Sequence, residues 1–212
     1  MLQTEVFNEN VKAYEAWYEK YPEVYQSELA AIKEQFLKLP ESIKGIEVGL
    51  GTGRFAEPLG IKEGIEPSNE MAKKAMKRGI EVMEGVAERI PYADLQFDFV
   101  LFVTICHLNE IKAALDHAHR VLKHGGAIII GFIDKDRSIA KQYEEKRESS
   151  TFFRHATFYT VNRIEKLLKE AGFKNFDYNQ TLFGTLEQIK KIQSPKQGFG
   201  EGSFVVVKAI KK

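Results

Sequence analysis

Cysteine is almost absent from this sequence, which holds a single one, Cys106, among 212 residues. A lone thiol forms no disulfide within the chain and excludes a zinc site built from several thiolates. No apolar run approaches the ~20 residues that span a bilayer, and the acidic N-terminal stretch lacks the apolar core of a signal peptide. We therefore expect a cytoplasmic protein that is not embedded in a membrane.

The sequence also has almost no net charge, because it contains 31 Lys and Arg residues and 30 Asp and Glu residues. This balance supplies no overall field that would attract a polyanion, so nucleic acid is not an expected partner. Hydrophobic residues make up 43% and charged residues 29% of the chain, a composition typical of a globular protein. Its length is that of one compact domain with a short appendage.

The first forty residues are polar with large apolar residues at helical spacing. Pro22 interrupts this pattern and Pro40 ends it. We predict two amphipathic helices that join at Pro22.

Beyond Pro40, short apolar runs alternate with helical stretches. Strands are expected at 45–48, 64–65, 80–83, 97–104, 127–133, 176–183 and 203–210, and helices at 69–78, 111–123, 135–148 and 159–171. Strands that alternate with helices predict an α/β fold, in which βαβ units build a mostly parallel sheet. The runs VLFVTI and AIIIGFI are apolar on both faces, as in central strands covered by helices.

The most informative segment is GIEVGLGTGRFA, in which an apolar strand runs into Gly49, Gly51 and Gly53 before a helical stretch. Glycines at such a junction permit positive φ and the close approach of a ligand to the backbone. The helix N-terminus that follows offers unpaired N–H groups to an anionic group. The same pattern also occurs in turns with a purely structural role.

Two carboxylates accompany this loop. Glu47 lies within the strand, and burying a carboxylate is costly unless a cationic or hydrogen-bonding group pairs with it. The alternative is a strand end that reaches solvent. Glu66 follows the next strand in the segment GIEPS, where an acidic side chain can accept both hydroxyls of a ribose.

The spacing of the glycines distinguishes between motifs for two classes of cofactor. A dinucleotide fingerprint counted from Gly49 needs its third glycine at position 54, where this chain has Arg54. The G-x-G-x-G spacing after an acidic residue instead resembles the first motif of class I S-adenosylmethionine-dependent methyltransferases. Further segments resemble this family in the right order: GIEPSNEMAKKA, GVAERIPY, FDFVLFVTICHL, HRVLKHGGAIII, FYTVNRIEKLLKEAGF and SFVVVKAIKK.

The resemblance implies a doubly wound, Rossmann-like, seven-stranded and mostly parallel sheet with an antiparallel last strand. It also implies a helical lid over residues 1–40 and a cofactor-binding core over residues 41–212. S-adenosylmethionine is the implied cofactor, with a binding set of Glu47, Gly49, Leu50, Gly51, Gly53, Glu66, Pro67, Met71, Ala87, Glu88 and Thr104. From the lid, Tyr14 and Tyr18 would join this set, with Trp17 beside them; plain amphipathic packing is the alternative. Val86 departs from the family, which commonly has Asp there to contact the adenine amino group.

Two histidines are candidates for a general base. His107 follows the fourth predicted strand, and His155 lies where this family builds its acceptor pocket. Cys106 at an apolar strand end is expected to be core rather than a nucleophile. His117 and His119 are two positions apart on a predicted helix and so project from different faces, and no metal site is expected.

The expected reaction is in-line methyl transfer to the oxygen, nitrogen or carbon of a small-molecule acceptor. The segment TICHLNE lacks the Asn/Asp-Pro-Pro-aromatic tetrapeptide of enzymes that methylate adenine or glutamine nitrogen. Two alternatives stay open: a non-catalytic module that binds S-adenosylmethionine, and a nucleotide-dependent oxidoreductase. The sequence does not indicate an oligomeric state.

Overall fold

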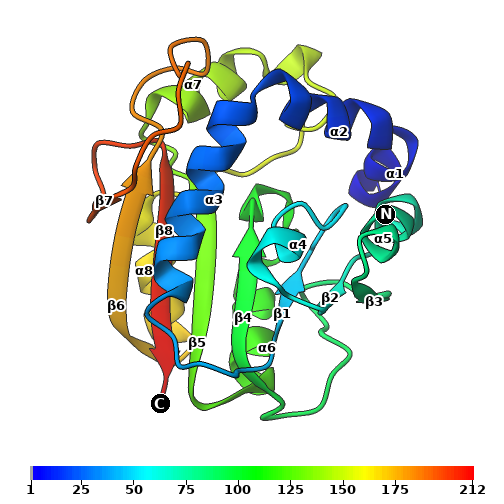
Figure 1. Cartoon of the computed structure of the whole chain (residues 1–212), viewed down its shortest axis with the longest axis vertical. Helices are drawn as coiled ribbons and strands as arrows, with labels where there is room; N and C mark the ends of the chain where they lie inside the picture. The colour runs from blue at the N-terminus through cyan, green and yellow to red at the C-terminus, as the bar shows by residue number, and fades with distance from the viewer. Residues whose placement is uncertain (1) are drawn as a thin grey trace.

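The computed structural model describes residues 2–212, with side chains described from Thr4 onward. Its centre is an eight-stranded sheet of order β3-β2-β1-β4-β5-β8-β6-β7 (Figure 1). The strands are β1 (Gly45–Val48), β2 (Glu63–Ile65), β3 (Glu81–Met83), β4 (Phe97–Val103), β5 (Leu122–Ile133), β6 (Phe173–Thr181), β7 (Lys196–Gln197) and β8 (Phe204–Lys211). Pairing is parallel from β3 across to β5, and β8 runs antiparallel to both β5 and β6.

The predicted mostly parallel α/β sheet with antiparallel pairing at its end is confirmed. It has eight strands rather than seven because Lys196 and Gln197, which lie outside the strands expected from the sequence, pair with the end of β6 as the short strand β7. A further difference lies in β5, which begins at Leu122 and runs through Gly125 and Gly126 rather than starting after them.

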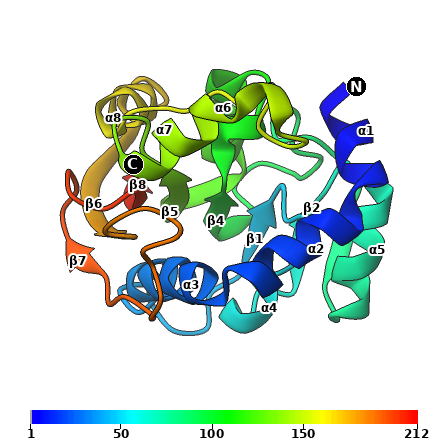
Figure 2. The same ribbon diagram turned by 90° about the horizontal axis from the view of Figure 1, so that it is seen from above.

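Helices cover both faces of the sheet (Figure 2). They are α1 (Leu2–Glu9), α2 (Val11–Lys20), α3 (Pro22–Phe36), α4 (Ala56–Leu59), α5 (Asn69–Lys77), α6 (Ile111–Val121), α7 (Ser138–Glu145) and α8 (Val161–Glu170), with short 3₁₀ turns η1 (Ile105–His107) and η2 (Arg147–Ser149). Helices α6 and α8 lie against one face, and α3 and α4 against the other. Thr160 caps α8, because its side chain accepts a hydrogen bond from the Arg163 amide.

The N-terminal segment forms three helices rather than two. Asn10 separates α1 from α2, and Tyr21 separates α2 from α3, whose first residue Pro22 takes the position that favours proline. Ala31 and Ile32 of α3 are fully buried in the core beside the central strands, whereas α1 and α2 pass over the carboxyl ends of β1 and β4 (Figure 1). Helix α3 is therefore part of the core, and only α1 and α2 lie where the predicted lid is expected.

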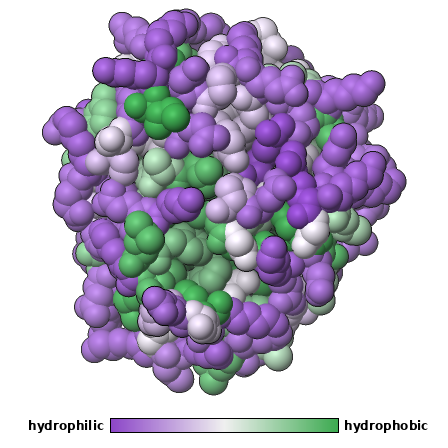
Figure 3. All heavy atoms as spheres, in the orientation of Figure 1, coloured by the Kyte–Doolittle hydropathy of each residue, from purple (hydrophilic) through white to green (hydrophobic). Residues whose placement is uncertain are grey.

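The strand order reverses between β1 and β4, because the chain winds outward from β1 to β3 and then returns to the other side of β1. Ligands of open α/β sheets bind at the carboxyl ends of the strands at such a point. Most of the surface in Figure 3 is hydrophilic, and its apolar area gathers between α3 and α4 in the lower middle of this view. Over the described part of the chain, no helix is long and apolar enough to cross a membrane.

Candidate functional site

A cavity of about 230 Å³ opens at this point of the sheet, between the ends of β1 and β4 and the helices α1 and α2. Most residues that the sequence singles out line it: Tyr14, Tyr18, Gly49, Gly51, Glu66, Pro67, Met71, Ala87, Glu88, Thr104 and His107. Glu47, Leu50 and Gly53 are close in sequence to this lining but are not part of it. His155 is exposed and lies outside the lining, which argues against its expected role as a general base.

The glycine loop after β1 adopts the left-handed backbone that the sequence predicts, with φ of +71° at Gly49, +57° at Gly51 and +81° at Gly53. A Cβ on Gly51 would lie 3.0 Å from the Tyr14 hydroxyl, so this position faces the cavity. A Cβ on Gly53 would lie 2.5 Å from the Ile80 side chain instead. Gly53 therefore serves the packing of the loop on the core, while Gly51 leaves room in the cavity.

Glu66 joins the end of β2 to this loop. One carboxylate oxygen accepts the Gly51 amide at 2.8 Å and the other accepts the Ser68 amide at 2.9 Å. Burial raises the pKa of Glu66 above its ordinary value, although both hydrogen bonds act to lower it. The carboxylate lines the cavity, so its remaining lone pairs are available to the hydroxyl groups of a ligand.

Glu47 is buried at 2% exposure, which excludes the alternative of a strand end that reaches solvent. Its Oε2 atom has no hydrogen-bond partner within the described residues. Burial holds the pKa of this carboxyl well above its usual range, although the Ala56 backbone amide acts to lower it. A buried acceptor of this kind is costly until a donor or a positive charge reaches it.

Two tyrosines of α2 cover the glycine loop. The hydroxyls of Tyr14 and Tyr18 lie 2.8 Å apart, and their rings meet edge to face at 5.3 Å. Burial raises the pKa of both phenols, with the nearby Glu47 carboxylate adding to this effect. Both hydroxyls are therefore neutral at physiological pH.

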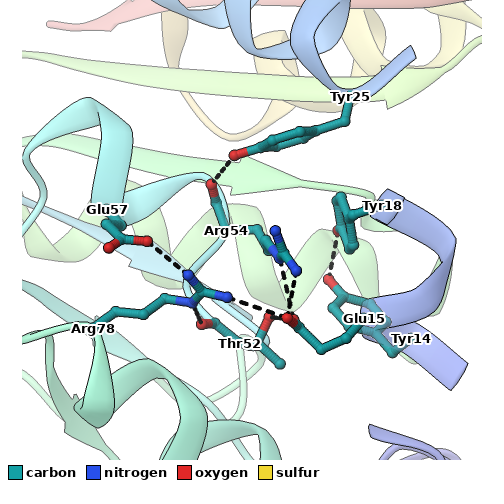
Figure 4. A network of polar contacts seen from close by, with 8 residues as sticks. All are labelled: Tyr14, Glu15, Tyr18, Tyr25, Thr52, Arg54, Glu57 and Arg78. Atoms are coloured by element: carbon teal, nitrogen blue, oxygen red, sulfur yellow. Dashed lines mark hydrogen bonds and ion pairs between the residues drawn. The ribbon is translucent and has the colours of Figure 1, made fainter. Parts of the chain in front are cut away.

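The neighbouring residue Glu15 anchors α2 to the same loop (Figure 4). Its carboxylate accepts hydrogen bonds from the Thr52 hydroxyl at 2.5 Å and from the guanidinium of Arg54 at 2.5 Å. Arg78, next to the end of α5, adds a contact at 3.2 Å and also pairs with Glu57 at 2.8 Å. Partial burial acts to raise the pKa of Glu15, but Arg54 and Thr52 lower it below its ordinary value. Arg54, notable in the sequence only because it replaces a glycine, thus holds α2 on the glycine loop.

The end of β4 brings three of the sequence candidates to the cavity. Thr104 has φ of +62°, a strained conformation for a non-glycine residue that is typical of functional sites. Burial lowers the pKa of His107 to about 4, so its imidazole is neutral near pH 7. Burial raises the pKa of Cys106 to about 12, and its thiol packs against Ala140, as expected for a core cysteine.

Glu88 lies close to Val86 in the sequence. Its Oε1 atom accepts hydrogen bonds from the backbone amides of Asn109 at 2.8 Å and Glu110 at 3.2 Å. These contacts fix the carboxylate against the start of α6 at the rim of the cavity.

No group of three or more metal-ligating side chains occurs in the described residues. His117 forms a hydrogen bond with Arg120, and the ring of His119 packs on Phe173.

Several lining residues were missed from the sequence as site residues: Thr4, Phe7, Glu28, Asn109 and Tyr143. Glu28 left a signal, because it shares the apolar face of α3 with Val24 and Ile32 at helical spacing. Tyr143 left none, because it sits in a charge-rich stretch that resembles a solvated helix.

Comparison with known proteins shows which families and solved structures this chain resembles. The family model described as "Methyltransferase domain" matches residues 19–178. A crystal structure from Thermotoga maritima, described as a SAM-dependent methyltransferase and possible histamine N-methyltransferase, is 42% identical with a TM-score of 0.94; the match covers 99% of this chain and 100% of that one. An uncharacterized protein of Methanocaldococcus jannaschii is 42% identical over 97% of this chain and 98% of its own. The demethylmenaquinone methyltransferase of Chlorobaculum tepidum is 31% identical over 67% of this chain and 70% of its own.

Proposed function

The chain belongs to the S-adenosylmethionine-dependent methyltransferases, and from this premise we propose that it methylates a small-molecule acceptor by in-line transfer. The observation that carries the proposal is the Glu66 carboxylate, held by the Gly51 and Ser68 amides at the wall of the cavity. When bound, S-adenosylmethionine supplies a methyl group that its sulfonium has already activated toward a nucleophile.

The residues present fit this cofactor. The buried Oε2 atom of Glu47 lacks a partner within the described residues, and Gly51 leaves the space that a Cβ would fill. We propose that Glu66 accepts the ribose hydroxyls, and that Pro67, Met71 and Ala87 flank the adenine. Gly49 and Gly51 would present backbone to the methionine part and the Glu47 Oε2 atom would accept a hydrogen bond from it, while Leu50 and Gly53 support the loop from behind.

The acceptor end of the cavity is proposed to lie beyond Thr104, toward Trp17, Tyr143 and Phe158. Helices α1 and α2 close this region, which excludes water and holds an acceptor in line with the methyl group. Tyr14 and Tyr18 present neutral rings at the junction of the two ends, where a cation is favoured. A small acceptor suits a cavity of about 230 Å³. A cytoplasmic location stays a prediction from the sequence.

His107 remains a candidate for contact with the acceptor rather than a strong base, because its pKa of about 4 makes it a weak proton acceptor at neutral pH. Its ring packs against Phe7 at 5.2 Å and Phe153 at 5.6 Å, so it is held among aromatic side chains.

The test is methyl transfer from labelled S-adenosylmethionine to a panel of small metabolites, with amines, hydroxyl compounds and activated carbon acids each represented. Calorimetric titration with S-adenosylhomocysteine and with NAD accompanies it. We expect binding of S-adenosylhomocysteine alone, and label in one or more acceptors. Binding of NAD instead would support an oxidoreductase, and binding of S-adenosylhomocysteine with no transfer to any acceptor would support a non-catalytic module.

A further inference from the structure

A third carboxylate lines the cavity besides those of Glu66 and Glu88. Glu28 of α3 lines the cavity and is only 7% exposed. Within the described residues, no hydrogen bond or ion pair reaches its carboxylate, and desolvation alone raises its pKa to about 8. An unpaired buried carboxylate destabilises a fold, and it points to a ligand group that supplies the missing partner.

The surroundings of Glu28 are aromatic and uncharged. Tyr18 from α2 and Tyr143 from α7 are the ionisable side chains that interact with it electrostatically, and burial raises the pKa of both phenols. Tyr143 in turn stacks on Phe153 at 4.1 Å and hydrogen-bonds with Trp17. A carboxylate among aromatic faces is the arrangement that recognises an organic cation.

The rest of the cavity has the same electrostatic character. No lysine or arginine lines it in the part of the chain that the structure describes, and its ionisable lining comprises Glu28, Glu66, Glu88, His107, Cys106 and the tyrosines. The thiol of Cys106 is neutral, and so is His107. Carboxylate or phosphate acceptors would meet no positive side chain there, whereas a protonated amine meets Glu28.

We propose that the methyl acceptor is a small amine, and that Glu28 binds its ammonium group and accepts its proton. This inference rests on the proposed methyltransferase function and names the substrate class for it. The amine reaches the cavity as an ammonium ion and forms an ion pair with the Glu28 carboxylate. One N–H proton then passes to the carboxylate, which frees the nitrogen lone pair.

The lone pair forms the new N–CH₃ bond as the S–CH₃ bond breaks, and the electrons of that bond stay on sulfur. The sulfonium becomes a neutral thioether, the methylated nitrogen keeps the positive charge as an ammonium ion, and Glu28 releases the proton that it accepted to solvent before the next turnover. No oxidant or second co-reactant is needed. A carboxyl with a pKa of about 8 in the free protein is well matched to accept a proton near neutrality.

The experiment compares acceptors that share one ring and differ in the polar group: phenethylamine, 2-phenylethanol and phenylacetate, each with labelled S-adenosylmethionine. The variants are Glu28→Gln, Glu28→Asp and, as a matched control on the same helix outside the cavity, Glu34→Gln. S-adenosylhomocysteine affinity and thermal unfolding are measured for every variant, so that a loss of cofactor binding or of folding is separated from a loss of acceptor recognition.

We expect transfer to the amine alone. Glu28→Gln should lower kcat/KM for the amine about 100-fold or more, with S-adenosylhomocysteine affinity unchanged within about twofold. Glu28→Asp should recover part of the activity, and Glu34→Gln should match the wild type. In the wild type, kcat/KM for the amine should rise with pH and level off near pH 8, and this limb should be absent in Glu28→Gln.

Transfer to the alcohol or the acid but not to the amine would overturn the inference. So would wild-type kcat/KM for the amine in Glu28→Gln, or no transfer to any of the probes by a protein that binds S-adenosylhomocysteine. Failure of the wild type to bind S-adenosylhomocysteine would instead overturn the proposed function itself.

Discussion

The backbone amide of Gly51 donates a 2.8 Å hydrogen bond to the carboxylate of Glu66, so that the loop after β1 and the tip of β2 form one wall of the cavity. We expect Glu66→Ala to weaken S-adenosylhomocysteine binding by about 1–3 kcal/mol, because a charge-assisted acceptor is lost. Isothermal titration measures this. Glu70→Gln, an exposed position on α5, is the control and should bind as the wild type does. Unchanged affinity in Glu66→Ala would refute its assigned place.

Gly51 should not tolerate a side chain. Gly51→Ala combines a strained φ of +57° with a Cβ 3.0 Å from the Tyr14 hydroxyl. Gly79→Ala is the matched control, since its φ is +79° but nothing lies within 4 Å of the added Cβ. Both should lose about 1 kcal/mol of stability, whereas Gly51→Ala alone should bind S-adenosylhomocysteine at least about tenfold more weakly. Equal affinities in the two variants would show that the loop does not contact the cofactor.

We expect the hydrogen bonds and ion pairs of Glu15 to hold α2 against the glycine loop. Glu15→Gln weakens the contacts to Arg54 and Arg78, and we expect a loss of about 1 kcal/mol in the free energy of unfolding together with weaker S-adenosylhomocysteine binding. Because the folded pKa of Glu15 is depressed, its contribution is present above pH ~4.3 and is lost as pH falls. Urea titrations at pH 7 and pH 4 should therefore show a smaller difference at pH 4. Glu19→Gln, exposed on the same helix, should have little effect at either pH.

Glu28 should have the opposite dependence on pH. Its folded pKa of about 8 lies above the unfolded value, so the native state keeps a proton that the unfolded state releases. Stability is then lost as pH rises from about 4.3 toward 8, at a slope of up to about 1.4 kcal/mol per pH unit. Glu28→Gln should remove this slope and become increasingly more stable than the wild type between pH 5 and pH 8. A gain that does not vary with pH would contradict the burial of an unpaired carboxyl.

His107 should stay neutral down to about pH 5, because desolvation lowers its pKa to about 4. A ¹H–¹⁵N NMR titration of the imidazole, assigned by comparison with His107→Asn, checks this. Titration of His107 between pH 6 and pH 7 would restore it as a general base and contradict its desolvation.

Much of the cofactor side was predictable from sequence because the loop and strand tips encode it locally. Gly51 needs a positive φ, and Glu66 follows a strand by the spacing of one βαβ unit, so local sequence predicts that both lie at the carboxyl ends of the strands. The pocket beyond Thr104 was not predictable in this way. Glu28 and Tyr143 meet only through tertiary packing of α3 and α7, and their interaction has no counterpart in local spacing.

The observed helices and strands differ from the sequence prediction where tertiary contacts override local propensity. Gly125 and Gly126 would stop a helix or loosen a strand in isolation, yet β5 runs through them because Leu122 already pairs with Phe97 of β4, and regular pairing with β4 and β8 resumes at Ala127. Helix α3 belongs to the core for a similar reason, since most of its apolar face packs on the sheet.

The charge of the cavity lining has a consequence for selection within a mixture of metabolites. ATP and the dinucleotides share adenosine with S-adenosylmethionine, but they carry phosphates. Across the described residues, the lining offers those phosphates carboxylates and no lysine or arginine. We therefore expect the proposed site to sort adenosine compounds by the sign of the group attached to the ribose, so that abundant anionic nucleotides compete poorly for it.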